Sequence, residues 1–160
     1  MITVSSSFEK AKKGLQFEDI FQTSVSAWIK EGFDPKFDVI EDYGIQFKQG
    51  VRQSNLLSIT EANQSTKIFR VYIDVGVRLV SDEKDDALAQ LEASYCIDYL
   101  VTDPHLSEDQ TALDEFALKN ACHHLWPYWR EYVMSQCTRM NLPKLPLPFH
   151  FVAPQPVNDE

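Results

Sequence analysis

LKNACHHLWPYWREYVMSQCTRMNLPKLPLPF, residues 118–149, is the stretch that decides the fold. Pro127 lies inside it and cannot donate a hydrogen bond to the carbonyl of His123, so we expect a kink or altered hydrogen bonding at residues 123–126. Asn141 and Pro143 predict the end of the helix, and the Leu/Pro repeat after them favours an extended strap. The helix itself is predicted by apolar residues at three-and-four spacing: Leu118, Cys122, Leu125, Trp129, Tyr132, Val133, Cys137 and Met140.

Two other segments carry helical signals. Ser107 and Gln110 have the spacing of a capping box, which favours helical structure ahead of the aromatic stretch. Residues 18–30 predict an amphipathic N-terminal helix that Gly32 would end. That second prediction rests on the spacing of Ile20, Phe21, Val25, Trp28 and Ile29.

Between these segments the hydrophobic period changes to two, which predicts strands. Residues 43–51, 68–80 and 89–101 alternate clearly, and a weaker group at 56–59 precedes a polar turn at 63–66. Strands followed by a long helix indicate an α+β fold, an antiparallel four-stranded sheet packed by the C-terminal helix. One face of the second clear strand is predicted to be core: Phe69, Val71, Ile73, Val75 and Val77.

Composition limits the class of protein. A chain of 160 residues with 44% apolar residues is expected to form a single domain over residues 1–160. A net charge of -9 disfavours nucleic acids and anionic membranes as partners. Three cysteines without C-x-x-C spacing fit a reducing compartment, so the cytoplasm is the expected location. No apolar run approaches the length of a membrane span.

Several of these motifs resemble the SecB family of export chaperones. The helix contains LWPY at residues 125–128 with Arg130 and Glu131 next, and a strap with Leu142, Pro143 and Leu145 follows. In SecB proteins an L-F-P-Y-A-R-E helix precedes an S-R-G-x-F-P-x-L-x-L strap. The resemblance includes the Cys-bearing strand ASYCID and extends over residues 43–151, leaving a 1–34 helical extension and a 152–160 tail.

The resemblance implies an ATP-independent holdase that binds unfolded or precursor proteins in hydrophobic grooves, without nucleotide, metal or other cofactor. SecB proteins are acidic cytosolic homotetramers, dimers of dimers, so a homotetramer is expected. Aromatic and Leu side chains of the helix and strap are the candidate client-binding residues: Trp126, Tyr128, Leu142, Leu145, Leu147 and Phe149. More regularly spaced residues are candidates for core or oligomer interface: Trp129, Tyr132, Val133 and Cys137.

Departures from the family leave the function open. In SecB proteins, acidic side chains on the outer sheet surface help dock the SecA motor, and here Gly44, Lys48 and Ile97 take their places. SecA is therefore a doubtful partner. A dedicated chaperone of one client, such as the antitoxin of a toxin–antitoxin system, is one alternative. An assembly protein whose aromatics are all buried between subunits is another.

Enzymatic and metal chemistry have weak support. His123 and His124 are adjacent and face different directions on a helix, and the cysteines with His105 and His150 lack zinc-finger spacing. Cys137 is more typical of a structural thiol than of a nucleophile. We therefore expect no catalytic residue and no metal site.

Overall fold

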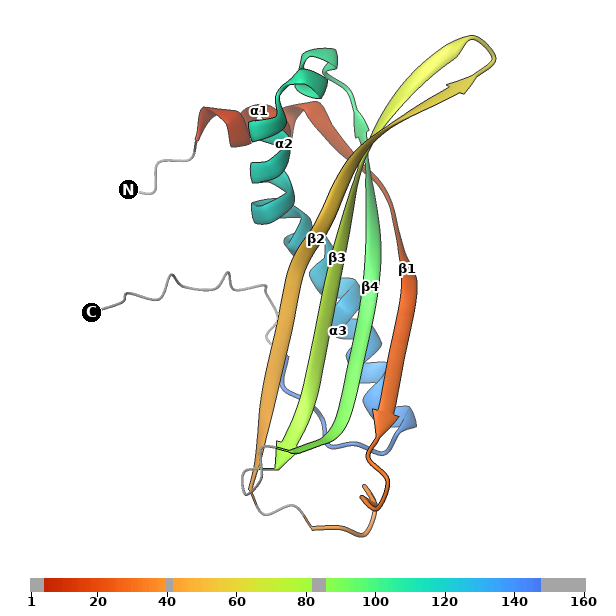
Figure 1. Ribbon diagram of the computed structural model, residues 1–160, viewed down its shortest axis with the longest axis vertical. Coiled ribbons are helices and arrows are strands. Elements are labelled where there is room, and N and C mark those ends of the chain that lie inside the picture. Colours follow the sequence, from red (N-terminus) through yellow and green to blue (C-terminus); the bar gives the residue numbers. More distant parts are fainter. Residues whose placement is uncertain (1–4, 40–41, 82–85, 148–160) are drawn as a thin grey trace, which may run out of the picture.

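The computed structural model has two layers, a four-stranded antiparallel sheet and a helical layer on one of its faces (Figure 1). It describes residues 5–39, 42–81 and 86–147. The strands are β1 (Leu15–Ile29), β2 (Tyr43–Glu61), β3 (Gln64–Ser81) and β4 (Asp86–Val101), in the spatial order β1-β4-β3-β2. The outer strands are therefore β1 and β2, and the expected α+β class with four strands is confirmed.

The β2–β3 hairpin turns at Ala62 and Asn63, whose positive φ values of 46° and 66° suit the tight turns that join twisted strands. The weak apolar group at 56–59 continues β2 and does not form a separate strand. Beyond the pair Ile68–Leu100, the hairpin has no neighbour in the sheet and projects from its end (Figure 1).

The helix predicted at residues 18–30 is wrong, because this segment is β1. Its register against β4 shifts between Phe17 and Asp19 and again between Gln22 and Ser24. Each bulge adds one residue, so residues on the same face lie three apart and imitate a helical period. The extra N-terminal helix exists further upstream as α1 (Ser6–Gly14), whose N-cap is Ser5.

Helical structure after the sheet begins earlier than the aromatic stretch, in η1 (Pro104–Glu108) and α2 (Gln110–Phe116). The proposed capping box is wrong in detail. The N-cap is Asp109, whose Oδ1 accepts a hydrogen bond from the Ala112 N–H at 3.1 Å. The Lys10 ammonium, followed by this Ala112 bond, lowers the pKa of the Asp109 carboxyl.

The long helix α3 (Cys122–Arg139) runs through Pro127, and the backbone irregularity is a π-helical turn at η2 (Ala117–Ala121), not at residues 123–126. Pro127 is exposed, so the missing hydrogen bond falls on the solvent side of the helix. At the other end, the Leu142 N–H donates to the Cys137 carbonyl at 2.9 Å and turns the chain into the strap.

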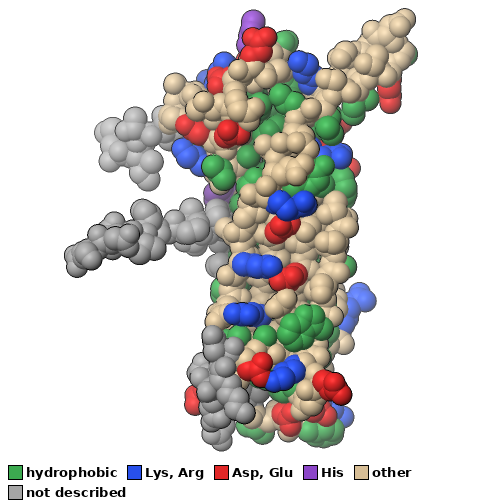
Figure 2. All heavy atoms as spheres, in the orientation of Figure 1, with side chains coloured by type: hydrophobic (Ala, Val, Ile, Leu, Met, Phe, Trp, Pro, Cys, Tyr) green, Lys and Arg blue, Asp and Glu red, His purple; other side chains and the backbone are tan. Residues whose placement is uncertain are grey.

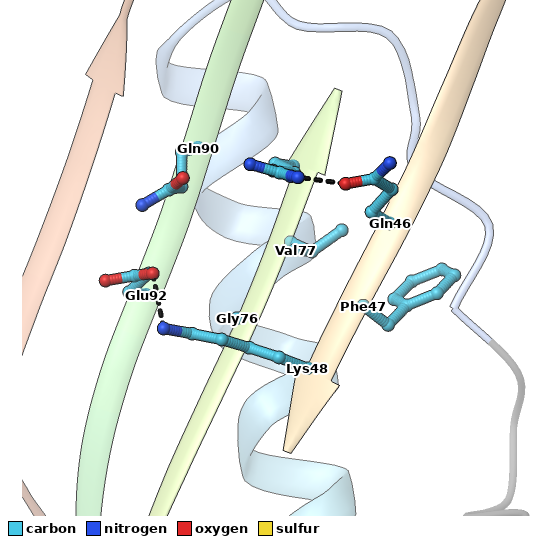
Figure 3. A pocket seen from close by; sticks show the side chains of 8 residues that line it. Gln46, Phe47, Lys48, Gly76, Val77, Gln90 and Glu92 are labelled. Atoms are coloured by element: carbon cyan, nitrogen blue, oxygen red, sulfur yellow. Dashed lines mark hydrogen bonds and ion pairs between the residues drawn. The ribbon is translucent and has the colours of Figure 1, made fainter. Parts of the chain in front are cut away.

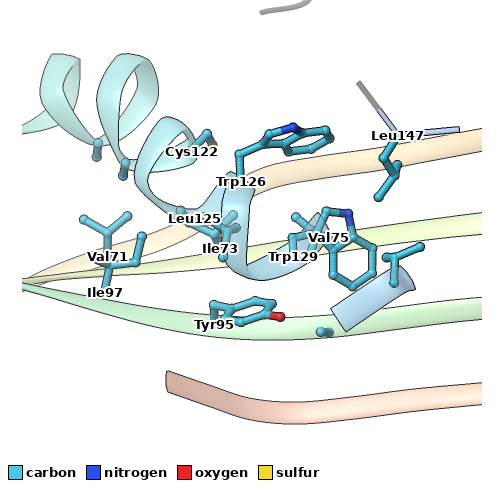
Figure 4. Packing of buried hydrophobic residues seen from close by; sticks show 14 of the residues in the cluster. Val71, Ile73, Val75, Tyr95, Ile97, Cys122, Leu125, Trp126, Trp129 and Leu147 are labelled. Atoms are coloured by element: carbon cyan, nitrogen blue, oxygen red, sulfur yellow. The ribbon is translucent and has the colours of Figure 1, made fainter. Parts of the chain in front are cut away.

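The core lies between α3 and the two central strands (Figure 4). Trp129 is 1% exposed and packs over the inner faces of β3 and β4, where Ile73 and Ile97 are fully buried. The five β3 residues predicted as core are all buried, which confirms that prediction. In the described residues, no helix is long and apolar enough to cross a membrane.

Candidate functional site: the sheet flanks and the strap

One helix cannot cover a four-stranded sheet. Four strands about 4.8 Å apart place the outer two roughly 14 Å from each other, whereas a helix with its side chains is about 10 Å wide. Accordingly α3 buries the inner faces of β3 and β4 and leaves apolar side chains on both outer strands in contact with solvent. These two flanks are the main exposed apolar surfaces that the fold creates.

The β1 flank is apolar on both faces of the strand. Phe17 and Val25 lie opposite the inward-facing Tyr99 and Ala93 of β4, so they belong to the inner face, and Val25 is 53% exposed. Phe21 and Trp28 lie on the outer face and are 39% and 38% exposed. The Arg70 guanidinium lies 5.4 Å from the centre of the Phe21 ring.

Over residues 44–55, the β2 flank is apolar on its inner face only. Phe47 lies opposite the inward-facing Val77 and is 53% exposed, and Leu56 further along is 37% exposed. Over residues 44–55 the side chains of β2 that face outward are polar or absent, as at Gln46, Lys48 and Gly50, whereas Leu57 and Ile59 face outward near the hairpin turn.

The strap and the solvent side of α3 enclose a hollow of about 770 Å³. Leu142 and Leu145 of the strap and Met134 of α3 contribute apolar surface to it. The Leu145 N–H bonds to Cys137, but burial outweighs this and raises the pKa of the thiol. Among the described residues, the lining consists of Pro127, Arg130, Glu131, Met134, Ser135, Cys137, Thr138, Leu142, Lys144 and Leu145.

Paired charges lie along the middle of the outer face of the sheet (Figure 2). The Arg70 guanidinium forms two hydrogen bonds to the Asp98 carboxylate, at 2.7 and 2.8 Å, which raises the pKa of Arg70. Arg52 pairs with Asp74 at 3.4 Å on the same face.

A hollow of about 280 Å³ on this face surrounds Gly76, which has no side chain to fill it (Figure 3). The Lys48 side chain crosses Gly76 and places its Nζ 2.6 Å from the Glu92 carboxylate. Placing Ile97 on the outer surface is wrong, because it is fully buried and faces α3, whereas Gly44 and Lys48 do face outward.

An aromatic cluster links β1 to the start of α3. The Tyr99 hydroxyl and the His124 Nδ1 share a hydrogen bond of 2.7 Å, and the Phe17 ring meets His124 edge-on at 5.7 Å. Burial raises the pKa of Tyr99 strongly, and burial followed by the charge of His123 lowers the pKa of His124. A neutral imidazole therefore suits this cluster.

The structure separates the candidate client-binding residues. Tyr128 is 47% exposed, while four others are at most 9% exposed and pack into the core: Trp126, Leu142, Leu145 and Leu147. Phe149 lies outside the described residues.

Of the residues considered for core or interface, Trp129, Val133 and Cys137 lie inside the subunit's own core. Tyr132 is half-buried and stacks on Trp129 with ring centres 5.8 Å apart.

Sequence reasoning missed the exposed apolar residues of the outer strands. Those of β1 were assigned to a helix because the bulges disguised their period. Phe47 belongs to the strand predicted at residues 43–51, but its exposure depends on the width of the sheet relative to α3, which no local pattern reports.

The chain is similar to several solved structures. The Rv1957 SecB-like chaperone of Mycobacterium tuberculosis, in complex with a ChAD peptide from the Rv1956 HigA1 antitoxin, aligns with a TM-score of 0.61. The alignment covers 94% of this chain and 100% of that chain at 17% identity. No family model matches the sequence, and no curated protein matches it. The chain thus has the SecB-like fold.

Proposed function

We propose that the protein is an ATP-independent chaperone that holds unfolded or precursor proteins against the apolar surface beside α3. The observation that supports this most is the pair of uncovered flanks, on which Val25 and Phe47 are each 53% exposed. Contiguous exposed apolar surface marks sites of protein interaction. Each Å² of it removed from water contributes about 25 cal/mol before ordering costs.

A homotetramer, with β1 in its subunit interface, is part of the proposal. A strand that is apolar on both faces is typical of the interior of a larger sheet. Three of the candidate interface residues would then stabilise the subunit's own core instead of contacting a second subunit: Trp129, Val133 and Cys137. Tyr132 remains a candidate for subunit contact. A cytoplasmic location fits the three cysteines, which are all free thiols.

The test is suppression of aggregation of a chemically denatured protein, followed by light scattering. We expect suppression at a stoichiometric amount of oligomer without added nucleotide. No suppression at any ratio would favour the alternative assembly protein, whose apolar flanks would all be covered by subunits.

A dedicated chaperone of one client is the second candidate. It is favoured by the structural relative, which was solved with an antitoxin peptide. It is also favoured by the outer sheet face, where Asp74, Glu92 and Asp98 each contact a cation of the same sheet and offer little to a basic docking domain. Binding of purified SecA would support export. Protection of a single small partner from proteolysis would support dedication.

A further inference from the structure

The helix and strap are basic in a protein that is acidic overall. Residues 117–147 hold four Lys or Arg and one carboxylate, Glu131, whereas the whole chain has a net charge of -9. The cations are Lys119, Arg130, Arg139 and Lys144.

Two of these cations line the hollow between the strap and α3. Arg130 and Lys144 stand beside apolar surface from Met134, Leu142 and Leu145, and Glu131 supplies the carboxylate of the lining. A volume of about 770 Å³ lies within the range of roughly 300–1,000 Å³ that is usual for ligand sites. The hollow therefore combines an apolar lining with a net positive charge.

The lysine and arginine at the centre of the outer sheet face are already paired with carboxylates. Lys48 and Arg70 of the outer sheet face each hold a carboxylate of β4. Lys144, in contrast, is exposed and has no ion-pair partner among the described residues. An incoming carboxylate at Lys144 would not have to displace a carboxylate of the described residues.

We propose that this hollow binds client segments in which apolar side chains are flanked by Asp or Glu. The apolar side chains would contact mainly Met134, with the small exposed parts of Leu142 and Leu145, and the carboxylates would pair with Lys144 and Arg130. Lysine-rich apolar segments are rejected by the same charges, so the site selects by repulsion as well as attraction. This inference rests on the proposed chaperone function and names the chemistry of its client.

The test uses three fluorescein-labelled peptides with identical aromatic and aliphatic residues, whose other positions carry Glu, Gln or Lys. Binding to the full chain is measured by fluorescence anisotropy at low and high salt. We expect the Glu peptide to bind about tenfold more tightly than the Gln peptide at low salt, with the Lys peptide weakest. High salt should reduce the difference, because the charges are near the surface.

Lys144→Glu is the decisive variant, because the Lys144 side chain is exposed and circular dichroism can confirm that the variant is folded. It should remove most of the preference for Glu over Gln. Lys67→Glu is the matched control, since this exposed residue of the β3 hairpin arm makes the same charge change far from the strap. Equal effects of the two variants would show that total charge, not the hollow, governs binding, and would overturn the proposal.

Two other results would also overturn it. Equal affinity for the Glu and Gln peptides would show that the hollow does not distinguish charged from neutral peptides. A change in oligomer mass on Lys144→Glu, with peptide binding unaltered, would assign the hollow to a second copy of the chain. If aggregation is suppressed in either case, the proposed chaperone function stands and this inference alone fails.

Discussion

The two edge strands of the sheet, β1 and β2, both carry exposed apolar side chains on the inner face, but they differ on the outer face. Val25 on β1 and Phe47 on β2 both face the helical layer, and both are 53% exposed because α3 is too narrow to reach them. On the outer face, β1 presents Phe21 and Trp28, whereas residues 44–55 of β2 present polar side chains and glycines. An edge strand that is apolar on both faces suits a permanent subunit interface, and one that is apolar on a single face suits transient binding of a partner.

The largest expected effect is therefore on assembly, from Val25→Asp. A carboxylate placed in the proposed subunit contact along β1 is costly to bury, so we expect the proposed oligomer to dissociate completely into subunits. Size-exclusion chromatography with light scattering measures the mass, and circular dichroism confirms that the subunit stays folded. An unchanged oligomer would place the subunit interface elsewhere.

Phe47→Asp is the matched change on the other edge. It removes a large apolar contact for clients without touching β1, so the oligomer should persist while affinity for an unfolded protein falls about tenfold or more. The measurement is titration of a labelled, permanently unfolded protein. If Phe47→Asp dissociates the oligomer and Val25→Asp weakens client binding, the roles of the two edges are reversed.

The same contrast explains what could be predicted from sequence. The alternation in residues 68–80 and 89–101 was regular, because β3 and β4 are buried on one face along their whole length, and their assignment was correct. In β1 the two bulges replaced a period of two by steps of three, and the prediction became a helix. Local periodicity is reliable where a strand is regular, and an edge strand often is not.

The candidate site shows a different limit. The sequence identified the aromatic helix and the strap, but it could not tell that Trp126 and Leu147 pack into the subunit's own core while Phe47 remains exposed. That division follows from where the strap folds and how far α3 reaches across the sheet, and both are tertiary properties. The basic hollow was missed for the same reason, since Arg130 and Lys144 come together only when the strap turns back.

A third test concerns the aromatic cluster that ties β1 to α3. Burial lowers the folded-state pKa of His124 below its usual 6.5, so the unfolded chain binds the proton more readily. The stability that the neutral ring contributes is complete above pH 6.5 and is lost as the pH falls through the folded-state pKa. Urea unfolding at pH 8 and at pH 5.5 measures this loss.

His124→Gln is the control for that titration, because an amide oxygen can accept a hydrogen bond from the Tyr99 hydroxyl and does not titrate in this range. We expect a smaller loss of stability between the two pH values in this variant. If the variant and the unchanged protein lose the same unfolding free energy between the two pH values, the pH dependence comes from groups other than His124.

The smallest expected effect tests how β2 is held from its outer face. A Cβ on Gly76 would stand 2.8 Å from Lys48 Cε, so Gly76→Ala must displace the side chain that reaches Glu92. Exposed ion pairs contribute about 1 kcal/mol or less. Gly50→Ala is the matched control, since its Cβ would meet nothing within 4 Å. By urea unfolding, Gly76→Ala should be the less stable variant, and the difference should vanish in a Lys48→Ala background if the crossing side chain is its cause.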